Sequence, residues 1–261
     1  MNLIEGNYHS IEANKEYWSV SQFKQFQECS DAAMAQLTGE YIRPETDALL
    51  MGSYVDAHFS GTGEEFRANH PEIFNSRTGE LKSQYKKAEN AITRAEQDKL
   101  FMEYMDGDTQ TIITGELYGL PWKCKVDVLH DDKIVDLKFM RNLDPVYKDG
   151  KRQTFIRAYD YDLQAFIYQK LVEQKTGKHL PFYLAVITKE EPADIQLIHI
   201  GDEFLKQPFD GRVAHFLPIF DKIKNYEAEP ERCEHCEWCR QSKVLTEPIE
   251  YETLYETLME V

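Results

Sequence analysis

Two short apolar segments with charged residues inside them constrain the fold of this chain most strongly. Residues 126–128 and 134–138 are β-branched or apolar around Asp127, Asp136 and Lys138, and a turn-forming stretch separates the two segments. Such a pattern predicts two buried strands joined by a tight connection. Side chains two positions apart on a strand share a face. Asp136 and Lys138 are therefore expected to point the same way, while the residues between them pack into a core.

Two carboxylates and an amine placed together suit metal-assisted cleavage of a phosphodiester. That reaction requires a divalent cation held by carboxylates, a water made more acidic by the cation, and a positive group for charge that develops on phosphate. Asp127 and Asp136 would hold the cation, with the backbone carbonyl of Leu137 as a further oxygen ligand. Lys138 would supply the positive group. A structural ion pair of Asp136 with Lys138 is the alternative, because the same Asp/Glu-x-Lys pattern occurs at four polar, turn-like places.

Further residues in a fixed order make the chain resemble a known family. They are Ser21-Gln22-Phe23 with Phe26 and Cys29, Gly52 to His58, Gly119 to Asp127, Asp136-Leu137-Lys138, and Gln164 with Tyr168. From about Tyr17 to Arg240 the chain resembles the RecB-type branch of the PD-(D/E)XK nucleases. More narrowly, it is similar to the RecE-like (exonuclease VIII-like) exodeoxyribonucleases of phages and prophages. The resemblance implies an α/β fold with a restriction-endonuclease-like core, in which helices flank a mixed central β-sheet.

The resemblance also assigns roles to individual residues. It makes His58 a metal ligand beside Asp127 and Asp136, and it makes Lys138 the motif lysine. From the residues alone, a histidine in the apolar segment 54–59 is more often a core residue than a ligand.

Three further catalytic positions follow from the resemblance. Glu116 matches an additional acidic position, which binds a second ion or instead pairs with Lys123 or Lys125. Gln164 and Tyr168 match a Gln-x-x-x-Tyr signature and lie one helical turn apart. They are expected to orient the active site or to touch DNA.

The second strong signal is the spacing of the cysteines. Cys233, Cys236 and Cys239 form a C-x2-C-x2-C run, and no signal peptide appears in the sequence, so we expect thiols in a reducing cytoplasm. Clustered thiolates bind a [4Fe-4S] cluster or a tetrahedral zinc ion, and both need a fourth ligand. Resemblance to relatives in the AddB and CRISPR-adaptation branches makes this ligand Cys29, which would clamp the N- and C-terminal regions together. His235 as a zinc ligand and unliganded thiols are the alternatives.

The fifth cysteine is expected to have a different role. Cys124 lies on the strand that carries Asp127 and is most simply a small core hydrophobe.

The charge distribution gives arguments both for and against binding of nucleic acid. A net charge of −16 excludes a broad, non-specific DNA coat. The twenty residues that begin at Lys138 nevertheless hold six basic residues against two acidic ones, interleaved with aromatic rings that suit stacking. The DNA-binding residues expected here are Arg141, Lys148, Lys151, Arg152 and Arg157. A solvated basic loop is the alternative.

The length of 261 residues and the apolar fraction of 42% allow one good-sized core. We expect a single nuclease domain over residues 1–245 and an acidic tail or docking helix over 246–261. Helices are expected over 19–39, 45–60, 81–105, 157–176 and 203–226, the last broken near Pro208. Strands are expected near 111–118, 121–129, 133–139, 181–188 and 195–200.

Taken together, the residues and the resemblance predict an exodeoxyribonuclease that uses Mg2+ or Mn2+ and degrades the ends of linear double-stranded DNA, with the 5′ strand as its target. A non-catalytic DNA- or partner-binding protein and a sequence-specific endonuclease of the same fold are the alternatives. The resemblance further implies phage-type recombination or repair, a homo-oligomeric ring around DNA, and a single-strand annealing protein as partner. No membrane association is expected, and the implied setting is the cytoplasm of a bacterial host that carries the phage or prophage.

Overall fold

A five-stranded mixed β-sheet forms the centre of the protein. The computed structural model describes residues 1–148, 150–205 and 208–252. The sheet order is β1-β2-β3-β6-β7, in which β3 and β6 run parallel and the other neighbours run antiparallel. The strands are β1 (Asp108–Leu117), β2 (Leu120–Leu129), β3 (Ile134–Met140), β6 (Phe182–Thr188) and β7 (Ile195–Ile200). Helix α9 (Tyr161–Thr176) makes the crossover that parallel strands require. The expected mixed sheet flanked by helices is confirmed.

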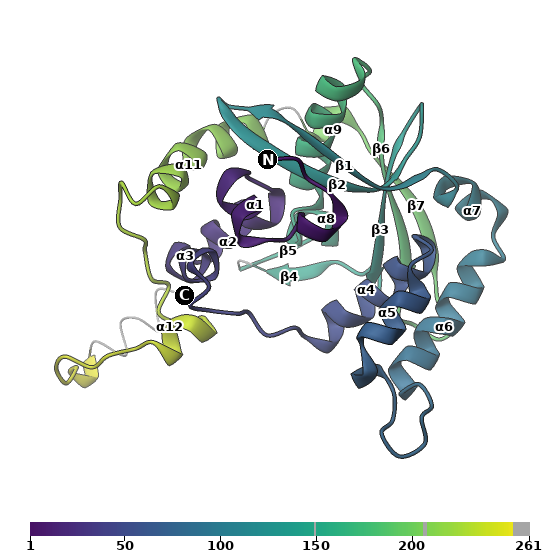
Figure 1. The fold of residues 1–261 in the computed structure, drawn as a ribbon, viewed down its shortest axis with the longest axis horizontal. Coiled ribbons are helices and arrows are strands. Elements are labelled where there is room, and N and C mark those ends of the chain that lie inside the picture. Colours follow the sequence, from purple (N-terminus) through teal and green to yellow (C-terminus); the bar gives the residue numbers. More distant parts are fainter. Residues whose placement is uncertain (149, 206–207, 253–261) are drawn as a thin grey trace.

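Helices cover both faces of this sheet, and Figure 1 shows them as two groups. One face packs against α2 (Val20–Glu28), α3 (Ser30–Thr38), α9 and α11 (Pro208–Lys224). The other packs against α4 (Asp47–Phe59), α6 (Ser83–Glu96) and α7 (Lys99–Met105). Successive strand residues point to opposite faces, and Ile134 and Val135 of β3 accordingly belong to the two different cores. Burial on both faces explains why these strands are so apolar.

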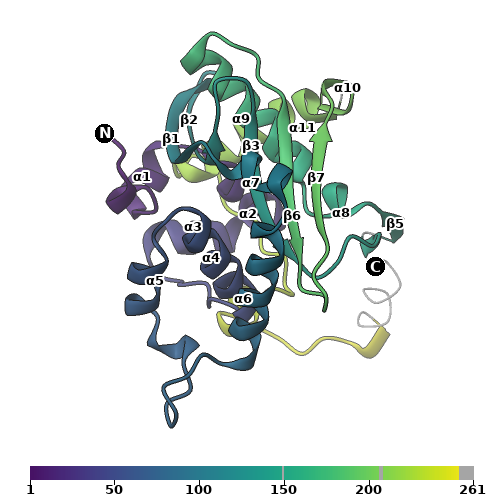
Figure 2. The ribbon, with the colours of Figure 1, turned by 90° about the vertical axis from the view of Figure 1, so that its right-hand side faces the viewer.

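The remaining elements are short. They are η1 (Glu5–Asn7), α1 (Ile11–Glu16), α5 (Gly63–Asn69), η2 (Pro71–Ile73), β4 (Val146–Lys148), β5 (Lys151–Gln153), α8 (Phe155–Ala158), α10 (Asp202–Leu205) and α12 (Glu237–Gln241). Strands β4 and β5 form a hairpin, and α8 lies beside it (Figure 2). The predicted basic loop is therefore partly a hairpin that leads into α9.

The predicted strands are confirmed to within three residues at each end. Three predicted helices are instead each divided in two. The first is broken at Cys29, which is extended (φ −168°, ψ 105°) and whose sulfur caps α3. The second is broken at Asp98, which caps α7, and the third at Asp160, which has a left-handed backbone (φ 54°). In each case a local side-chain or backbone preference interrupts a continuous apolar stripe.

The last predicted helix is also divided in two, at the break that Pro208 predicted. Helix α10 ends at Leu205 and α11 begins at Pro208; residues 206–207 lie outside the described ranges. Residues 253–261 of the predicted acidic tail lie outside them as well. Within the described part of the chain, no helix has both the length and the apolar character needed to cross a membrane.

Candidate functional site

The candidate site begins where β2 and β3 separate. These strands pair only through Val128 with Val135 and Leu129 with Ile134. One step further, Asp127 Oδ2 accepts a hydrogen bond from the backbone N–H of Leu137 at 2.8 Å. The side chain thus satisfies a backbone donor that the ladder no longer pairs. Because the N–H and C=O of a strand residue leave the strand on the same side, the Leu137 carbonyl faces the same opening.

Asp136 is the most enclosed polar residue of the site, with only 2% of its side chain exposed. Its Oδ1 atom accepts a hydrogen bond from Gln164 Nε2 of α9 at 2.5 Å. Its Oδ2 atom forms an ion pair with the ammonium of Lys138 and has no further hydrogen-bond partner among the described residues. Lys138 Nζ also lies 5.0 Å from the centre of the Tyr161 ring. Burial alone would lower the pKa of Lys138, but Asp136 and Asp127 raise it overall, so the amine stays protonated.

Helix α4 adds a third carboxylate, that of Asp56. Both of its oxygens accept hydrogen bonds from Gln110 Nε2, at 3.0 and 3.2 Å. Burial raises the pKa of Asp56, and repulsion from Asp136 raises it further against the opposing effects of Lys125 and Lys138. Asp56 was not predicted as a site residue.

The carboxylates of the site repel one another. Burial raises the pKa of Asp127 well above its usual range, and the charges of Asp136 and Asp56 add to that effect. When ionised, the three carboxylates outnumber the two ammonium groups that oppose their charge, those of Lys138 and Lys125. A divalent cation with a preference for oxygen ligands would balance this charge, and Mg2+ or Mn2+ fits the donor set.

His58 does not lie with these carboxylates, although the family resemblance makes it a metal ligand. Residues two apart on an α-helix point about 200° away from each other, so Asp56 faces the sheet and His58 faces outward. His58 Nε2 lies 2.8 Å from Glu96 Oε1 in a surface ion pair. The α4 side chain whose charge acts on Asp127 is that of Asp56.

Glu116 is also remote from the site. It lies on β1 six residues beyond Gln110, which corresponds to about 20 Å along a strand. Its side chain is exposed, and its backbone is held at both polar atoms by the amide of Gln174, at 3.0 and 2.7 Å. Neither expected partner pairs with it: Lys123 donates to Asn14, and Lys125 forms an ion pair with Glu5 at 3.0 Å.

Gln164 and Tyr168 lie on the same side of α9 but at different depths. Gln164 contacts Asp136 directly, as given above. Tyr168 packs against Phe182, with ring centres 6.2 Å apart, in the core beneath the carboxylates. Burial, together with charged neighbours that include Asp136 and Asp127, raises the pKa of Tyr168. This placement favours a role in orienting the site and leaves contact with DNA to other residues.

A basic cleft of about 720 Å³ lies beside Lys138. The predicted DNA-binding residues Lys148, Lys151 and Arg157 line it. Lys24 of α2 and Arg212 of α11 also line it, although neither was predicted. The other two predicted residues, Arg141 and Arg152, are exposed and do not belong to its lining.

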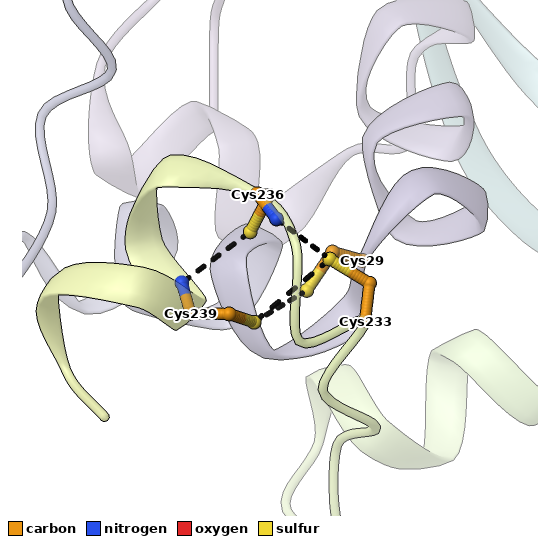
Figure 3. A group of neighbouring side chains, drawn as sticks. All are labelled: Cys29, Cys233, Cys236 and Cys239. Carbon is orange, nitrogen blue, oxygen red and sulfur yellow. Dashed lines mark hydrogen bonds between the residues drawn. The ribbon is translucent and has the colours of Figure 1, made fainter. Parts of the chain in front are cut away.

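A second centre consists of four cysteines, shown in Figure 3. Cys29 comes from the start of α3, and Cys233, Cys236 and Cys239 surround the start of α12. Their sulfur atoms all lie within 4.8 Å of one another, with 3.6 Å between Cys29 and Cys239 and 3.9 Å between Cys233 and Cys239. The structure thus brings together the four cysteines that were expected to form the clamp.

Backbone donors surround this centre. The N–H groups of Cys236 and Cys239 point at the sulfurs of Cys233 and Cys236, at 3.3 and 3.4 Å. Burial alone would raise the pKa of Cys233, but backbone N–H groups lower it to about 6. His235 Nδ1 instead lies 2.6 Å from the Cys233 carbonyl oxygen, so Cys29 and not His235 completes the group.

Cys124 lies apart from the other cysteines. It is 1% exposed on β2 and belongs to the core that α9 covers, as expected.

The chain is similar to known proteins over most of its length. Residues 19–242 match the model of a family described as a PDDEXK-like domain of unknown function (DUF3799). A crystal structure of a protein named "Putative exonuclease" from Eubacterium rectale is 43% identical, covers 97% of this chain and 98% of that chain, and superposes with a TM-score of 0.94. Among curated proteins, none matches the chain.

Proposed function

This chain belongs to the PDDEXK-like family DUF3799, and from that premise we propose that it is a deoxyribonuclease that uses Mg2+ or Mn2+ and degrades linear double-stranded DNA from its ends. The observation that carries the proposal is the convergence of Asp127, Asp136 and Lys138 at the point where β2 and β3 separate, with Asp56 and Gln164 beside them. The preference for ends is supported by the name of the similar protein from Eubacterium rectale, a putative exonuclease.

Each residue of the site has a definable task in hydrolysis of a phosphodiester. Asp56, Asp127, Asp136 and the Leu137 carbonyl would hold the cation. When bound, the cation supplies Lewis-acid chemistry that acidifies a water and offsets charge on the phosphate. Gln164 fixes the orientation of Asp136, and the Leu137 N–H fixes that of Asp127.

Lys138 supplies the fixed positive charge of the site. The neighbouring carboxylates keep it protonated, so it stabilises negative charge that develops on the phosphate in the transition state. The Tyr161 ring covers its ammonium and limits access of water from that side.

Linear and covalently closed circular DNA, each incubated with Mg2+, test the proposal. We expect loss of the linear DNA alone, and we expect Lys138→Ala to lower the rate by about 100-fold or more, as for removal of one preorganised electrostatic donor. The matched control is Lys175→Ala, because Glu173-Gln174-Lys175 repeats the same tripeptide pattern on an exposed part of α9. Cleavage of the circle would indicate the endonuclease alternative. Full activity of the Lys138→Ala protein, or no cleavage by the wild type, would contradict the proposal.

The wider biological setting is proposed from the resemblance to RecE-like proteins. It comprises attack on the 5′ strand, phage-type recombination or repair, a homo-oligomeric ring and a single-strand annealing partner. End-labelled duplexes report which strand is attacked, and light scattering reports the mass of the assembly. Attack on the 3′ strand or a monomeric mass would remove the corresponding part of the proposal.

We further propose that the four cysteines hold one tetrahedral metal ion, with zinc as the best candidate. Zn–S bonds of about 2.3 Å place the four sulfurs of a regular tetrahedron about 3.8 Å apart, close to the 3.6 and 3.9 Å between sulfurs here. A [4Fe-4S] cluster inserts four irons between its cysteines and needs them farther apart. The C-x2-C-x2-C spacing suits either group, and the distances favour the single ion. Such an ion would cross-link Cys29 to Cys239, 210 positions along the chain.

A further inference from the structure

The basic cleft beside the active site is built from segments that are far apart in the sequence. Its walls come from α2, the β4–β5 hairpin, the junction of α8 with α9, and α11. Its volume of about 720 Å³ lies within the range of about 300–1,000 Å³ that is typical of pockets for small ligands. A cleft of this size has room for a short stretch of single strand.

The acidic residues of the cleft are paired with arginines. Asp160 accepts two hydrogen bonds from Arg212, at 2.6 and 3.3 Å. Asp162 forms an ion pair with Arg157 at 2.9 Å. These two carboxylates are therefore paired within the wall, and the third, that of Glu28, pairs with Arg43 outside the cleft at 3.6 Å.

The lysines of the cleft are placed differently. Lys24 Nζ donates to the backbone carbonyl of Tyr159 at 2.6 Å, and Lys148 Nζ donates to that of Ala158 at 2.7 Å. Among the described residues, no carboxylate forms an ion pair with Lys24, Lys148 or Lys151. An ammonium has three N–H donors, so a carbonyl that takes one of them orients the group and leaves the other donors for a ligand. On a chain of net charge −16, such a set of lysines favours an anionic ligand.

The cleft adjoins the proposed catalytic residues directly. Tyr161 forms part of its wall and also covers the ammonium of Lys138. Burial lowers the pKa of Lys24 against the opposing charge of Asp160, and the positive charges of Lys138 and Lys148 lower it further. The cleft lysines and Lys138 are thus close enough to contact consecutive parts of one ligand.

Aromatic rings complete the cleft. Tyr159 is 43% exposed, and its ring centre lies 5.8 Å from that of Tyr161. Aromatic rings next to lysines are the combination with which proteins bind single-stranded nucleic acid, because bases stack on the rings while the cations contact the phosphates.

We propose that this cleft binds a short single-stranded segment of the substrate DNA next to the scissile phosphate, with Lys24 and Lys148 on its phosphates and Tyr159 under a base. The inference rests on the proposed nuclease function and specifies its substrate: the strand that is cut leaves its complement before it reaches Asp136. Ends with a short single-stranded extension are therefore cut faster than blunt ends.

Binding without cleavage tests this inference separately from the nuclease proposal. A fluorescent oligothymidylate is titrated with protein in Mg2+-free buffer at several salt concentrations. We compare the wild type with Lys24→Gln/Lys148→Gln, in which each side chain keeps N–H donors but loses its positive charge. We expect affinity to fall tenfold or more, and the slope of log K against log salt to decrease in size by about 1.4, or about 0.7 for each lost phosphate contact.

The matched control is Lys86→Gln/Lys87→Gln, which removes two exposed lysines from α6, a helix of the other core. It is expected to leave affinity and slope unchanged. Unchanged binding by Lys24→Gln/Lys148→Gln, or an equal loss in the control, would overturn the inference. A wild-type protein that binds the oligonucleotide through these lysines but cuts no DNA would refute only the nuclease proposal.

A second variant tests the inference independently, in case the first variant does not fold. Tyr159→Leu keeps every lysine, and loss of one stacked base is expected to weaken binding by about fivefold to 150-fold. Lys24→Arg/Lys148→Arg is expected to restore most of the affinity by restoring the charge. If Tyr159→Leu binds as the wild type does and the arginine variant binds no better than the glutamine variant, the cleft does not hold the strand.

Discussion

The carboxylate of Asp127 and the backbone N–H of Leu137 are joined by a hydrogen bond of 2.8 Å. Asp127 lies one residue and Leu137 two residues beyond the last paired positions of β2 and β3, which are Val128 and Val135. The hydrogen bond therefore connects the two strands at the point where their ladder stops and holds an ionisable side chain in the opening. The same atom pair thus serves both the local structure and the candidate metal site.

Asp127→Asn separates these two roles. Asparagine keeps an oxygen that accepts the Leu137 N–H but removes one of three carboxylates that repel one another. Without Mg2+, we expect the variant to be more stable than the wild type, because burial and two neighbouring carboxylates disfavour the ionised form of Asp127. With Mg2+, we expect the rate of DNA cleavage to fall by about 100-fold or more. Urea unfolding in Mg2+-free buffer measures the first effect, and a nuclease assay measures the second.

The control for this variant is Asp132→Asn, because Asp132 is exposed in the turn between β2 and β3 and pairs with Lys133. It should change neither stability nor rate appreciably, since exposed ion pairs contribute little. A destabilised Asp127→Asn protein would show that carboxylate repulsion in the site is small.

Asp56 and His58 give a direct contrast between the structure and the family resemblance. The charge of Asp56 influences Asp127, and that of Asp136 influences Asp56, whereas His58 pairs with Glu96 at the surface. We expect Asp56→Asn to lower the cleavage rate by about 100-fold or more and His58→Ala to leave it within about twofold. Rates measured over a series of Mg2+ concentrations distinguish weaker metal binding from slower chemistry. The opposite ranking of the two variants would restore His58 as the ligand.

The sequence was sufficient to predict the parts of the site that lie on strands. Alternation along β3 placed Asp136 and Lys138 on one face, and the apolar residues around Asp127 indicated a neighbouring strand. Asp56 was not predicted, although it lies in the motif segment 52–58, because the family resemblance assigned the metal ligand of that segment to His58. The helical geometry offered a signal: Asp56 is a lone carboxylate in an apolar run, one turn after Gly52.

Other features could not be derived from local patterns. Lys24 and Arg212 line the same cleft from α2 and α11, and only the packed fold brings these helices together. The breaks at Cys29, Asp98 and Asp160 depend on single caps and one left-handed residue, which an amphipathic stripe does not show. The cysteine centre could be predicted from the sequence, because three of its members lie within seven residues.

Cys29→Ser tests the proposed cross-link. If one metal ion joins Cys29 to the three C-terminal cysteines, the variant should lose most of its bound zinc. It should also unfold with a free energy lower by about 2–5 kcal/mol, comparable to the loss of a native cross-link. Elemental analysis and urea unfolding measure the two effects. The control is Cys124→Ala, which changes a buried cysteine outside the centre and should retain the ion.

The colour of the protein distinguishes the two metal centres. Zinc has a filled d shell, so anaerobically purified protein should show no visible absorption, whereas a [4Fe-4S] cluster would make it brown. Iron in place of zinc would contradict the argument from the sulfur distances.

Lys224 makes the stability of the fold depend on pH. Its ammonium contacts Gln22 Oε1 at 3.0 Å and lies 4.4 Å from the Trp18 ring centre, and burial lowers its pKa to about 7. The unfolded chain, with a lysine pKa of about 10.4, then binds more protons than the folded protein between these values, so stability rises as pH increases. From pH 7 to 8.5 we expect Lys224 to add about 1–2 kcal/mol to the free energy of unfolding. Urea unfolding at both pH values should show a smaller rise in stability for Lys224→Met. The control is Lys222→Met, which changes an exposed lysine on the same helix and should retain the full rise. An equal rise in both variants would show that other groups cause the pH dependence.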